Sequence, residues 1–101
     1  MSILIFTAQI RPEHVEETEA GGRKVFAAVE AAAPEGFRYA VGRIGPSTYV
    51  TILEIADGTR NPLRDLPEYD DFQAKLPNWL AEPSVGGPVT LVGSYRVFDE
   101  S

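Results

Sequence analysis

The stretch FRYAVGRIGPSTYVTILEIA, residues 37–56, decides the fold of this chain. Aromatic and β-branched residues dominate both of its halves, 37–44 and 48–56, as is typical of strands. The GPS sequence at 45–47 is a short turn, so the two halves form an antiparallel hairpin. The chain therefore contains an antiparallel sheet, and the sequence on either side of the hairpin determines what else is attached to it.

A strand and a helix precede the hairpin. ILIFTAQI, residues 3–10, reads as a strand that Arg11-Pro12 ends. From Pro12 to the residue before Pro34, apolar and small residues recur at three- and four-residue spacing, which predicts an amphipathic helix. Its predicted apolar face is Val15, Thr18, Gly22, Val25, Phe26, Val29 and Ala33, and its predicted solvent face is Glu16, Glu19, Arg23, Lys24 and Glu30.

A second helix and a last strand are predicted after the hairpin. The helix starts near Pro67, and Pro77 in its interior predicts a kink or a break. Gly86-Gly87-Pro88 reads as a turn, and the last strand is expected at 89–98. The order β-α-β-β-α-β is the ferredoxin-like arrangement, an α+β class in which two helices cover one face of a four-stranded antiparallel sheet.

Composition limits the class of protein. The 101 residues fit a single domain, 1–101, with 44% hydrophobic and 24% charged residues. The absence of cysteine excludes disulfides and thiolate zinc sites and fits a cytoplasmic protein, and no apolar stretch is long enough for a membrane span. A net charge of −6 without a basic cluster argues against nucleic acid or an anionic membrane as partner. No cofactor or metal is expected.

Both faces of the predicted sheet are apolar. On the first strand Phe6 points to one side and Ile5 to the other, and the strands 48–56 and 89–98 repeat this pattern. The helices cover one face only, so a monomer would expose an apolar patch of a size that soluble monomers usually avoid. We therefore expect a homodimer that packs sheet on sheet.

The order of elements and several segments carry a resemblance to a known family. The segments are ILIFTAQI (3–10), RPEHVEE (11–17), GFRYAVGR (36–43), TYVTILEIAD (48–57), and PEYDDFQ (67–73) with LVGSYRVF (91–98). Together they resemble the antibiotic-biosynthesis-monooxygenase-like group of small dimeric α+β barrel proteins. The resemblance covers nearly the whole chain. It implies a barrel made of two sheets, and in each subunit a pocket between the sheet and its helices.

The resemblance also implies two kinds of activity. One is cofactor-independent oxidation of aromatic phenols, in which Asn, Trp, Tyr and Arg side chains hold the substrate while the substrate itself reduces oxygen. The other, haem degradation, needs a histidine on the second helix and an asparagine in the first strand, and the chain has neither. The residues expected to be catalytic are Asn61, Trp79 and Tyr69, and those expected to bind the substrate, a small apolar or aromatic molecule, are Phe26, Tyr39, Phe72 and Arg38.

Several of these residues have a second, structural interpretation. Trp79 could stack on a planar ligand or belong to the core, and Asn61 could hold an oxygen or form a turn beside Pro62. Arg38 could bind an anionic ligand or pair with Glu54 at the dimer seam. The strand tyrosines could donate to a ligand carbonyl, act as acids if their pKa is lowered, or simply pack.

Two further features stay open. His14, the single histidine, either joins a nearby glutamate in a metal site or is a solvated residue at a helix start. Gly21-Gly22 inside a helix indicates a close backbone approach or room for a ligand, since each glycine costs about 1 kcal/mol relative to alanine.

We therefore expect a cofactor-independent monooxygenase acting on a small aromatic or polyketide-like substrate. The alternative is a non-catalytic dimeric module that binds a small molecule or a protein. An isomerase or decarboxylase on the same barrel is a weaker third possibility, because it needs an acid and a base facing one pocket.

Overall fold

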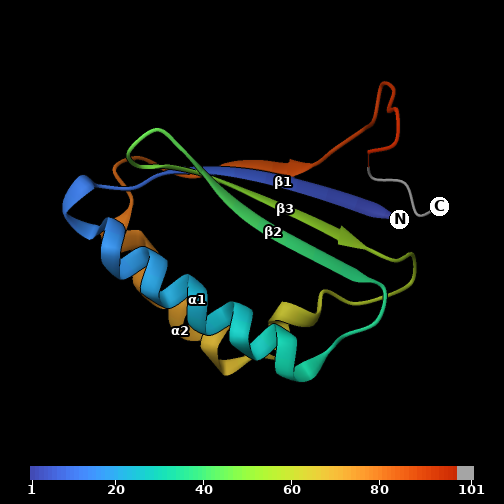
Figure 1. Ribbon diagram of the computed structural model, residues 1–101, viewed down its shortest axis with the longest axis horizontal. Helices are drawn as coiled ribbons and strands as arrows, with labels where there is room; N and C mark the ends of the chain where they lie inside the picture. Colours follow the sequence, from blue (N-terminus) through green and yellow to red (C-terminus); the bar gives the residue numbers. More distant parts are fainter. Residues whose placement is uncertain (98–101) are drawn as a thin grey trace.

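The structure, a computed structural model, describes residues 1–97 and contains one four-stranded sheet (Figure 1). Its strands are β1 (Ser2–Gln9), β2 (Phe37–Ile44), β3 (Thr48–Ile55) and β4 (Val85–Pro88). They lie in the order β2-β3-β1-β4, and every neighbouring pair is antiparallel.

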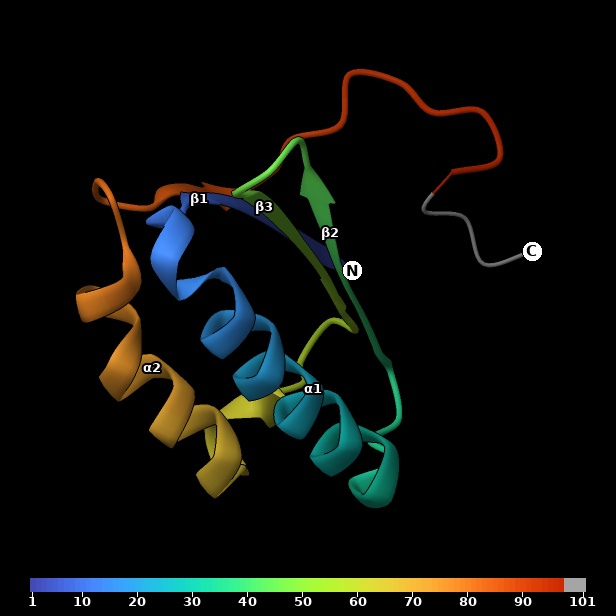
Figure 2. The ribbon, with the colours of Figure 1, turned by 60° about the vertical axis from the view of Figure 1, so that its left-hand side comes forward.

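Two helices cover one face of this sheet. They are α1 (Val15–Ala32), which follows the 3-10 turn η1 (Pro12–His14), and α2 (Pro67–Trp79), which follows the 3-10 turn η2 (Pro62–Asp65). Figures 1 and 2 show both helices beneath the sheet and side by side. The predicted ferredoxin-like α+β fold is confirmed. Within the described residues, no helix is long and apolar enough to cross a membrane.

The helix α1 begins and ends close to its predicted bounds. Pro12 opens the preceding 3-10 turn, and Glu16 and Glu17 in the first turn of α1 favour the helix dipole. At the other end, Ala33 adopts a left-handed conformation (φ 46°) and donates its N–H to the carbonyl of Val29 at 2.8 Å. Pro34 follows, so the chain leaves the helix and turns back toward β2.

The register of the hairpin sorts side chains between the helices and the opposite side. Tyr39 pairs with Leu53 and Arg43 with Tyr49, and these positions face the helices. Two core clusters form on this face, one of Ile10, Tyr49 and Trp79, and the other of Val25, Leu53 and Leu63.

The helix α2 runs through Pro77 without a break, so of the predicted kink or break the break was wrong. Pro77 lies in the last turn, where it removes only one hydrogen bond before the helix ends. Leu80 still donates its N–H to the carbonyl of Leu76 at 3.1 Å, and Trp79 is 7% exposed in the core. Burial of Trp79 thus stabilises the last turn of α2, which Pro77 weakens.

The last strand lies earlier than predicted. β4 is formed by Val85–Pro88, the segment that the sequence indicated as a turn, and residues 89–97 are not in a strand. A side chain at Gly86 would place its Cβ 2.2 Å from the carbonyl oxygen of Ile5, so only glycine allows β4 to approach β1 this closely. Phe98, the end of the predicted strand, lies outside the described residues.

The segment 89–97 runs on the side of the sheet away from the helices (Figures 1 and 2). It begins with a hydrogen bond from the N–H of Val89 to the carbonyl of Ile3 at 2.8 Å. Its large apolar side chains Leu91, Val92, Tyr95 and Val97 are exposed. Although its sequence alternates like that of a strand, this segment neither pairs as a strand nor buries these side chains within a single subunit.

Candidate functional site

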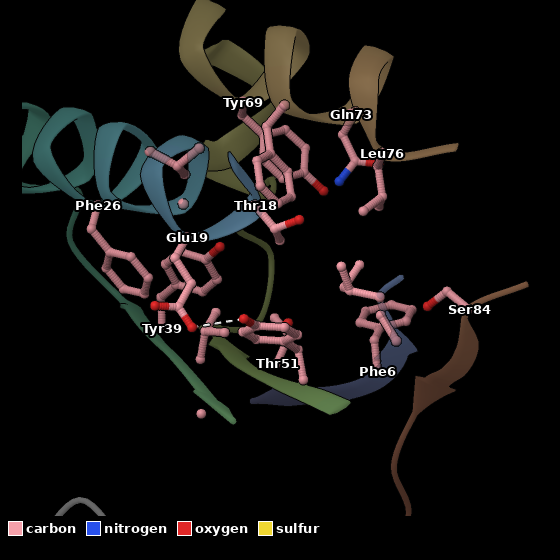
Figure 3. Close-up of a pocket in the computed structure, with 18 of the residues that line it drawn as sticks. Phe6, Thr18, Glu19, Phe26, Tyr39, Thr51, Tyr69, Gln73, Leu76 and Ser84 are labelled. Carbon is pink, nitrogen blue, oxygen red and sulfur yellow. Dashed lines mark hydrogen bonds between the residues drawn. The ribbon is translucent and has the colours of Figure 1, made fainter. Parts of the chain in front are cut away.

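A cavity of about 590 Å³ lies between the sheet and the two helices. This volume is in the range of small-molecule sites. Figure 3 shows its labelled residues pointing toward one another: Phe6 and Thr51 from the sheet, Thr18 and Glu19 from α1, and Tyr69 and Gln73 from α2. The sheet and both helices thus contribute side chains to the cavity.

Most of the cavity wall is apolar and aromatic. The rings of Phe26 on α1 and Tyr39 on β2 stack at a centroid distance of 4.5 Å and an angle of 17°. Phe6, Tyr69 and Phe72 add three more rings from β1 and α2. Such a wall suits a flat, apolar molecule.

One edge of the cavity is charged. Glu19 on α1 accepts a hydrogen bond from the hydroxyl of Tyr49 at 2.7 Å, shown by the dashed line in Figure 3. The same carboxylate oxygen lies 3.4 Å from Nε of Arg43, and the other lies 3.8 Å from Nη1 of Arg23. The three side chains around Glu19 come from β3, β2 and α1, so folding brings them together.

The pKa values of three tyrosines that line the cavity are raised above the ordinary value. Burial, together with the nearby Tyr69, raises the pKa of Tyr39 to about 12. Burial raises the pKa of Tyr49 to about 12 with help from the hydrogen bond to Glu19 and its charge, against the opposing effect of Arg43. Burial also raises the pKa of Tyr69. The possibility that strand tyrosines act as acids through a lowered pKa was wrong for Tyr39, whose pKa is raised. The hydroxyl of Tyr49 donates its hydrogen bond to Glu19.

These raised pKa values predict a loss of stability at high pH. A tyrosine whose pKa is about 10 unfolded and about 12 folded stabilises the fold fully below pH 10, and that contribution is lost as the pH rises toward 12. Urea unfolding from pH 8 upward, together with tyrosinate absorbance, measures this, and Tyr39→Phe should reduce the loss. Ionisation of all four tyrosines together near pH 10 in the folded protein would contradict it.

The structure brings four of the seven predicted site residues to the cavity. Tyr69 and Phe72 on α2, Phe26 on α1 and Tyr39 on β2 all line it. Their predicted roles in catalysis and binding remain predictions, although their positions fit a shared ligand.

The other three predicted site residues lie away from the cavity. The side-chain oxygen of Asn61 accepts the N–H of Leu63 at 3.0 Å and so caps η2, as its turn interpretation had it. Trp79 packs in the core with Ile10 and Tyr49, edge-on to Phe72 at 5.6 Å, and does not itself line the cavity. Arg38 projects from the opposite face of the sheet, with its Nη1 3.9 Å from Glu54.

The charged edge was missed at the level of sequence. Glu19 and Arg23 were assigned to the solvent face of the first helix, but both line the cavity. A signal did exist in the hairpin, because its register makes Arg43 and Tyr49 direct cross-strand partners on the helix-facing side. A polar pair on a face that should be buried marks a place where a helix must supply a matching group.

The two glycines in α1 have different surroundings, and the predicted close approach is found at Gly21. A Cβ at Gly21 would lie 3.0 Å from the ring of Phe72, so Gly21 allows α1 and α2 to approach closely. A Cβ at Gly22 would meet nothing within 4 Å, and Gly22 lines the cavity.

The described residues offer no obvious metal site. His14 contacts Glu17 at 2.8 Å across one helical turn. Among the residues that the structure describes, no cluster of three or more histidine and acidic side chains is close enough to hold a metal ion.

These features define a small ferredoxin-like α+β domain with a ligand-sized apolar cavity between its sheet and its helices. Neither the known protein-family models nor the curated proteins match this sequence. Solved structures do share its fold, and the names of several confirm the resemblance that was predicted from the sequence.

A provisionally named antibiotic biosynthesis monooxygenase from Caulobacter crescentus CB15 aligns over 91% of this chain and 90% of its own, with a TM-score of 0.74 and 18% identity. A protein of the same provisional name from Nitrosomonas europaea covers 90% of this chain and 89% of its own, with a TM-score of 0.73 and 15% identity. A mutant of SnoaB, a cofactor-independent oxygenase from Streptomyces nogalater, covers 94% and 96%, with a TM-score of 0.67 and 17% identity. At these identities the likeness establishes the fold.

Proposed function

We propose that this protein is a monooxygenase that oxidises a small aromatic or polyketide-like molecule without a cofactor. The observation that carries the proposal is the cavity of about 590 Å³, whose wall combines six aromatic rings with one carboxylate among the described lining residues, that of Glu19. The names of its structural neighbours, one of them a cofactor-independent oxygenase, add support. The absence of cysteine favours the cytoplasm as its location.

The proposed chemistry needs only what this cavity contains. Glu19 accepts a proton from an acidic C–H or O–H of the substrate, and the resulting anion passes electrons to molecular oxygen. In an anthrone-like ring, one oxygen atom replaces the two hydrogens of the reactive carbon as a carbonyl. The other oxygen atom leaves with those hydrogens as water. The neutral hydroxyls of Tyr39 and Tyr69 donate hydrogen bonds to the developing oxyanion.

Oxygen uptake with an anthrone-like substrate tests this function. Glu19→Gln keeps the size of the side chain but removes its ability to accept a proton, so we expect turnover to fall by about a hundredfold or more. Arg60→Met is the matched control, because Arg60 pairs with Asp65 outside the cavity and its loss should leave turnover unchanged. Oxygen uptake no faster than the buffer background, across anthrone- and catechol-like substrates, would refute the activity.

A second candidate function is non-catalytic binding of the same kind of molecule. It is favoured because Asn61 and Trp79, two of the predicted catalytic residues, lie off the cavity, while its tyrosines have raised pKa values. Saturable binding of an anthrone-like molecule by a protein that consumes no oxygen would establish this alternative.

We also propose that the protein is a homodimer joined through the sheet face opposite the helices. Ile5 and Ile52 are directly paired across β1 and β3 at the centre of this apolar face. Beside them, the buried Oε1 of Glu54 has the Nη1 of Arg38 at 3.9 Å, beyond hydrogen-bond distance, and accepts no hydrogen bond from the described residues, which favours a donor from a second copy. The exposed apolar side chains of residues 89–97 lie on the same side.

Ile52→Lys should convert this dimer to a monomer, because it places a charge at the centre of the apolar face. Sedimentation velocity over a range of concentrations measures the change. Ala31→Lys, on the exposed surface of α1, is the control and should remain dimeric. A wild-type protein that sediments as a monomer at every concentration would rule the dimer out.

A further inference from the structure

The charges that line the cavity are few and gathered at one place. Among the described lining residues, only Glu19, Arg23 and Arg43 carry formal charge, and both arginines approach the carboxylate of Glu19. Two guanidinium groups against one carboxylate leave one positive charge at this edge. The chain as a whole has a net charge of −6, so the edge of the cavity has the opposite sign to the rest of the protein.

The bonds within this cluster leave donors available to a ligand. The Nε of Arg43 faces Glu19 at 3.4 Å, and its Nη1 donates to the carbonyl of Pro46 at 3.4 Å. Its Nη2 has no partner among the described residues, and the Arg43 side chain is 46% exposed. An arginine fixed on two sides by protein groups offers its remaining N–H groups in a defined direction.

The Oε2 atom of Glu19 contacts both Tyr49 and Arg43. It accepts a hydrogen bond from the Tyr49 hydroxyl at 2.7 Å, and a raised pKa keeps that hydroxyl protonated at neutral pH. Glu19 and Tyr49 therefore hold Arg43 in place, and the excess positive charge of the cluster remains for a group that enters the cavity.

We propose that the ligand of this cavity is an acidic aromatic molecule, whose anionic oxygen (a carboxylate, or an ionised phenol or enol) binds to Arg43 and Arg23 while its ring lies on the apolar wall. Arg43 makes the main contact. Tyr49 and the Oε2 atom of Glu19 position Arg43, and the Oε1 atom of Glu19 remains the proton acceptor of the proposed function. The inference rests on the proposed function in so far as both place the ligand in this cavity. It adds the requirement that the ligand carry an acidic group. It also assigns selection of that group to Arg43 and Arg23 rather than to the aromatic residues of the wall.

The requirement also fits the chemistry. A positive charge beside the bound oxygen stabilises a phenolate or enolate more than the neutral molecule. A bound acidic phenol would thus lose its proton more readily in the cavity than in water, which is the step that an oxidation by molecular oxygen needs.

Two probes of nearly equal shape test the proposal. Naphthoate and naphthamide carry the same ring, but only naphthoate is anionic at neutral pH. Isothermal titration calorimetry on the wild-type protein should give naphthoate about a tenfold lower Kd than naphthamide, which corresponds to about 1.4 kcal/mol. The difference should shrink as salt is added, because the cluster lies at the partly exposed edge.

Two substitutions should shift this preference in opposite directions. Arg43→Met should remove most of the tenfold preference, because it weakens the binding of anionic naphthoate much more than that of neutral naphthamide. Glu19→Gln should tighten naphthoate binding by about two- to fivefold, because it removes the competing negative charge while keeping an acceptor for Tyr49. Arg60→Met, outside the cavity, should change neither. A purely structural role for the cluster would not produce opposite shifts that depend on the charge of the probe.

The outcomes separate this inference from the proposed function. Equal affinity for the two probes, unaffected by Arg43→Met, would overturn the acidic ligand and leave the cavity as a binding site for neutral molecules. Binding of neither probe to the folded wild-type protein would overturn both.

Discussion

Replacing Gly86 with alanine is expected to lower the free energy of unfolding by about 3 kcal/mol or more. The added Cβ would lie 2.2 Å from the carbonyl oxygen of Ile5 and 2.5 Å from the Cα of Phe6, and both are backbone atoms that have no other rotamer to adopt. The φ of Gly86 is 153°, a value that L side chains rarely adopt. The strand β4 must therefore move away from β1, and the hydrogen bonds between them weaken.

The neighbouring glycine provides the control for this experiment. Gly87 has nearly the same backbone conformation, with φ 159°, but a Cβ there would meet nothing within 4 Å. Urea denaturation should thus show a much smaller loss for Gly87→Ala than for Gly86→Ala. A loss of 1 kcal/mol corresponds to about 4–8 °C in Tm for a domain near this size, so thermal melting separates the two variants as well. Equal losses would mean that backbone conformation alone, rather than contact with β1, determines the requirement for glycine.

Replacing Gly22 with leucine is expected to block the cavity and abolish ligand binding while the protein stays folded. Gly22 lies on the same face of α1 as the buried Thr18, four residues before it, and Val25, three residues after it. A Cβ at Gly22 would enter open space. A leucine fills part of the cavity from the helix side. It also removes a helix-interior glycine, which costs about 1 kcal/mol relative to alanine. Calorimetry with naphthoate, and oxygen uptake with an anthrone-like substrate, should both show losses of tenfold or more.

Gly22→Ala separates the two effects of that substitution. Alanine gains the same helix propensity but fills little of the cavity, so the variant should be more stable by about 1 kcal/mol and should still bind ligand. Full ligand binding by a folded Gly22→Leu variant would contradict the assignment of this cavity as the ligand site.

The first three strands and the first helix could be predicted from the sequence because their signals are local. The Gly45-Pro46-Ser47 turn fixes the hairpin, and Pro12 and Pro34 flank the helix that precedes it. The aromatic part of the cavity followed in the same way, since Tyr69 and Phe72 recur at helical spacing.

The last strand could not be predicted because its position depends on a contact between distant segments. Gly86 and Gly87 have the composition of a turn, and only the approach of β4 to Ile5 and Phe6 reveals why glycine is needed there. Residues 89–98 have the alternation of a strand, but a strand forms only where an edge is available to pair with it.

The charged edge of the cavity could not be predicted for a related reason. Glu19 is one residue away from the apolar stripe of its helix, and in the folded chain it reaches the hydroxyl of Tyr49 on the sheet at 2.7 Å. Its interpretation as a solvated residue was reasonable from helical spacing alone. The cross-strand pair of Arg43 and Tyr49 was the one local sign that a partner was required.

The close approach of β4 to β1 also limits how this cavity can diverge. Gly86 lines it, and no larger residue fits there, so this wall consists of main chain and its position is fixed. The wall at Gly22 is free to accept any side chain that the cavity can hold. Relatives that differ in the size of their ligand should thus vary at the position of Gly22 and keep glycine at that of Gly86, and a library meant to change the size of the accepted ligand should begin on α1 and leave β4 untouched.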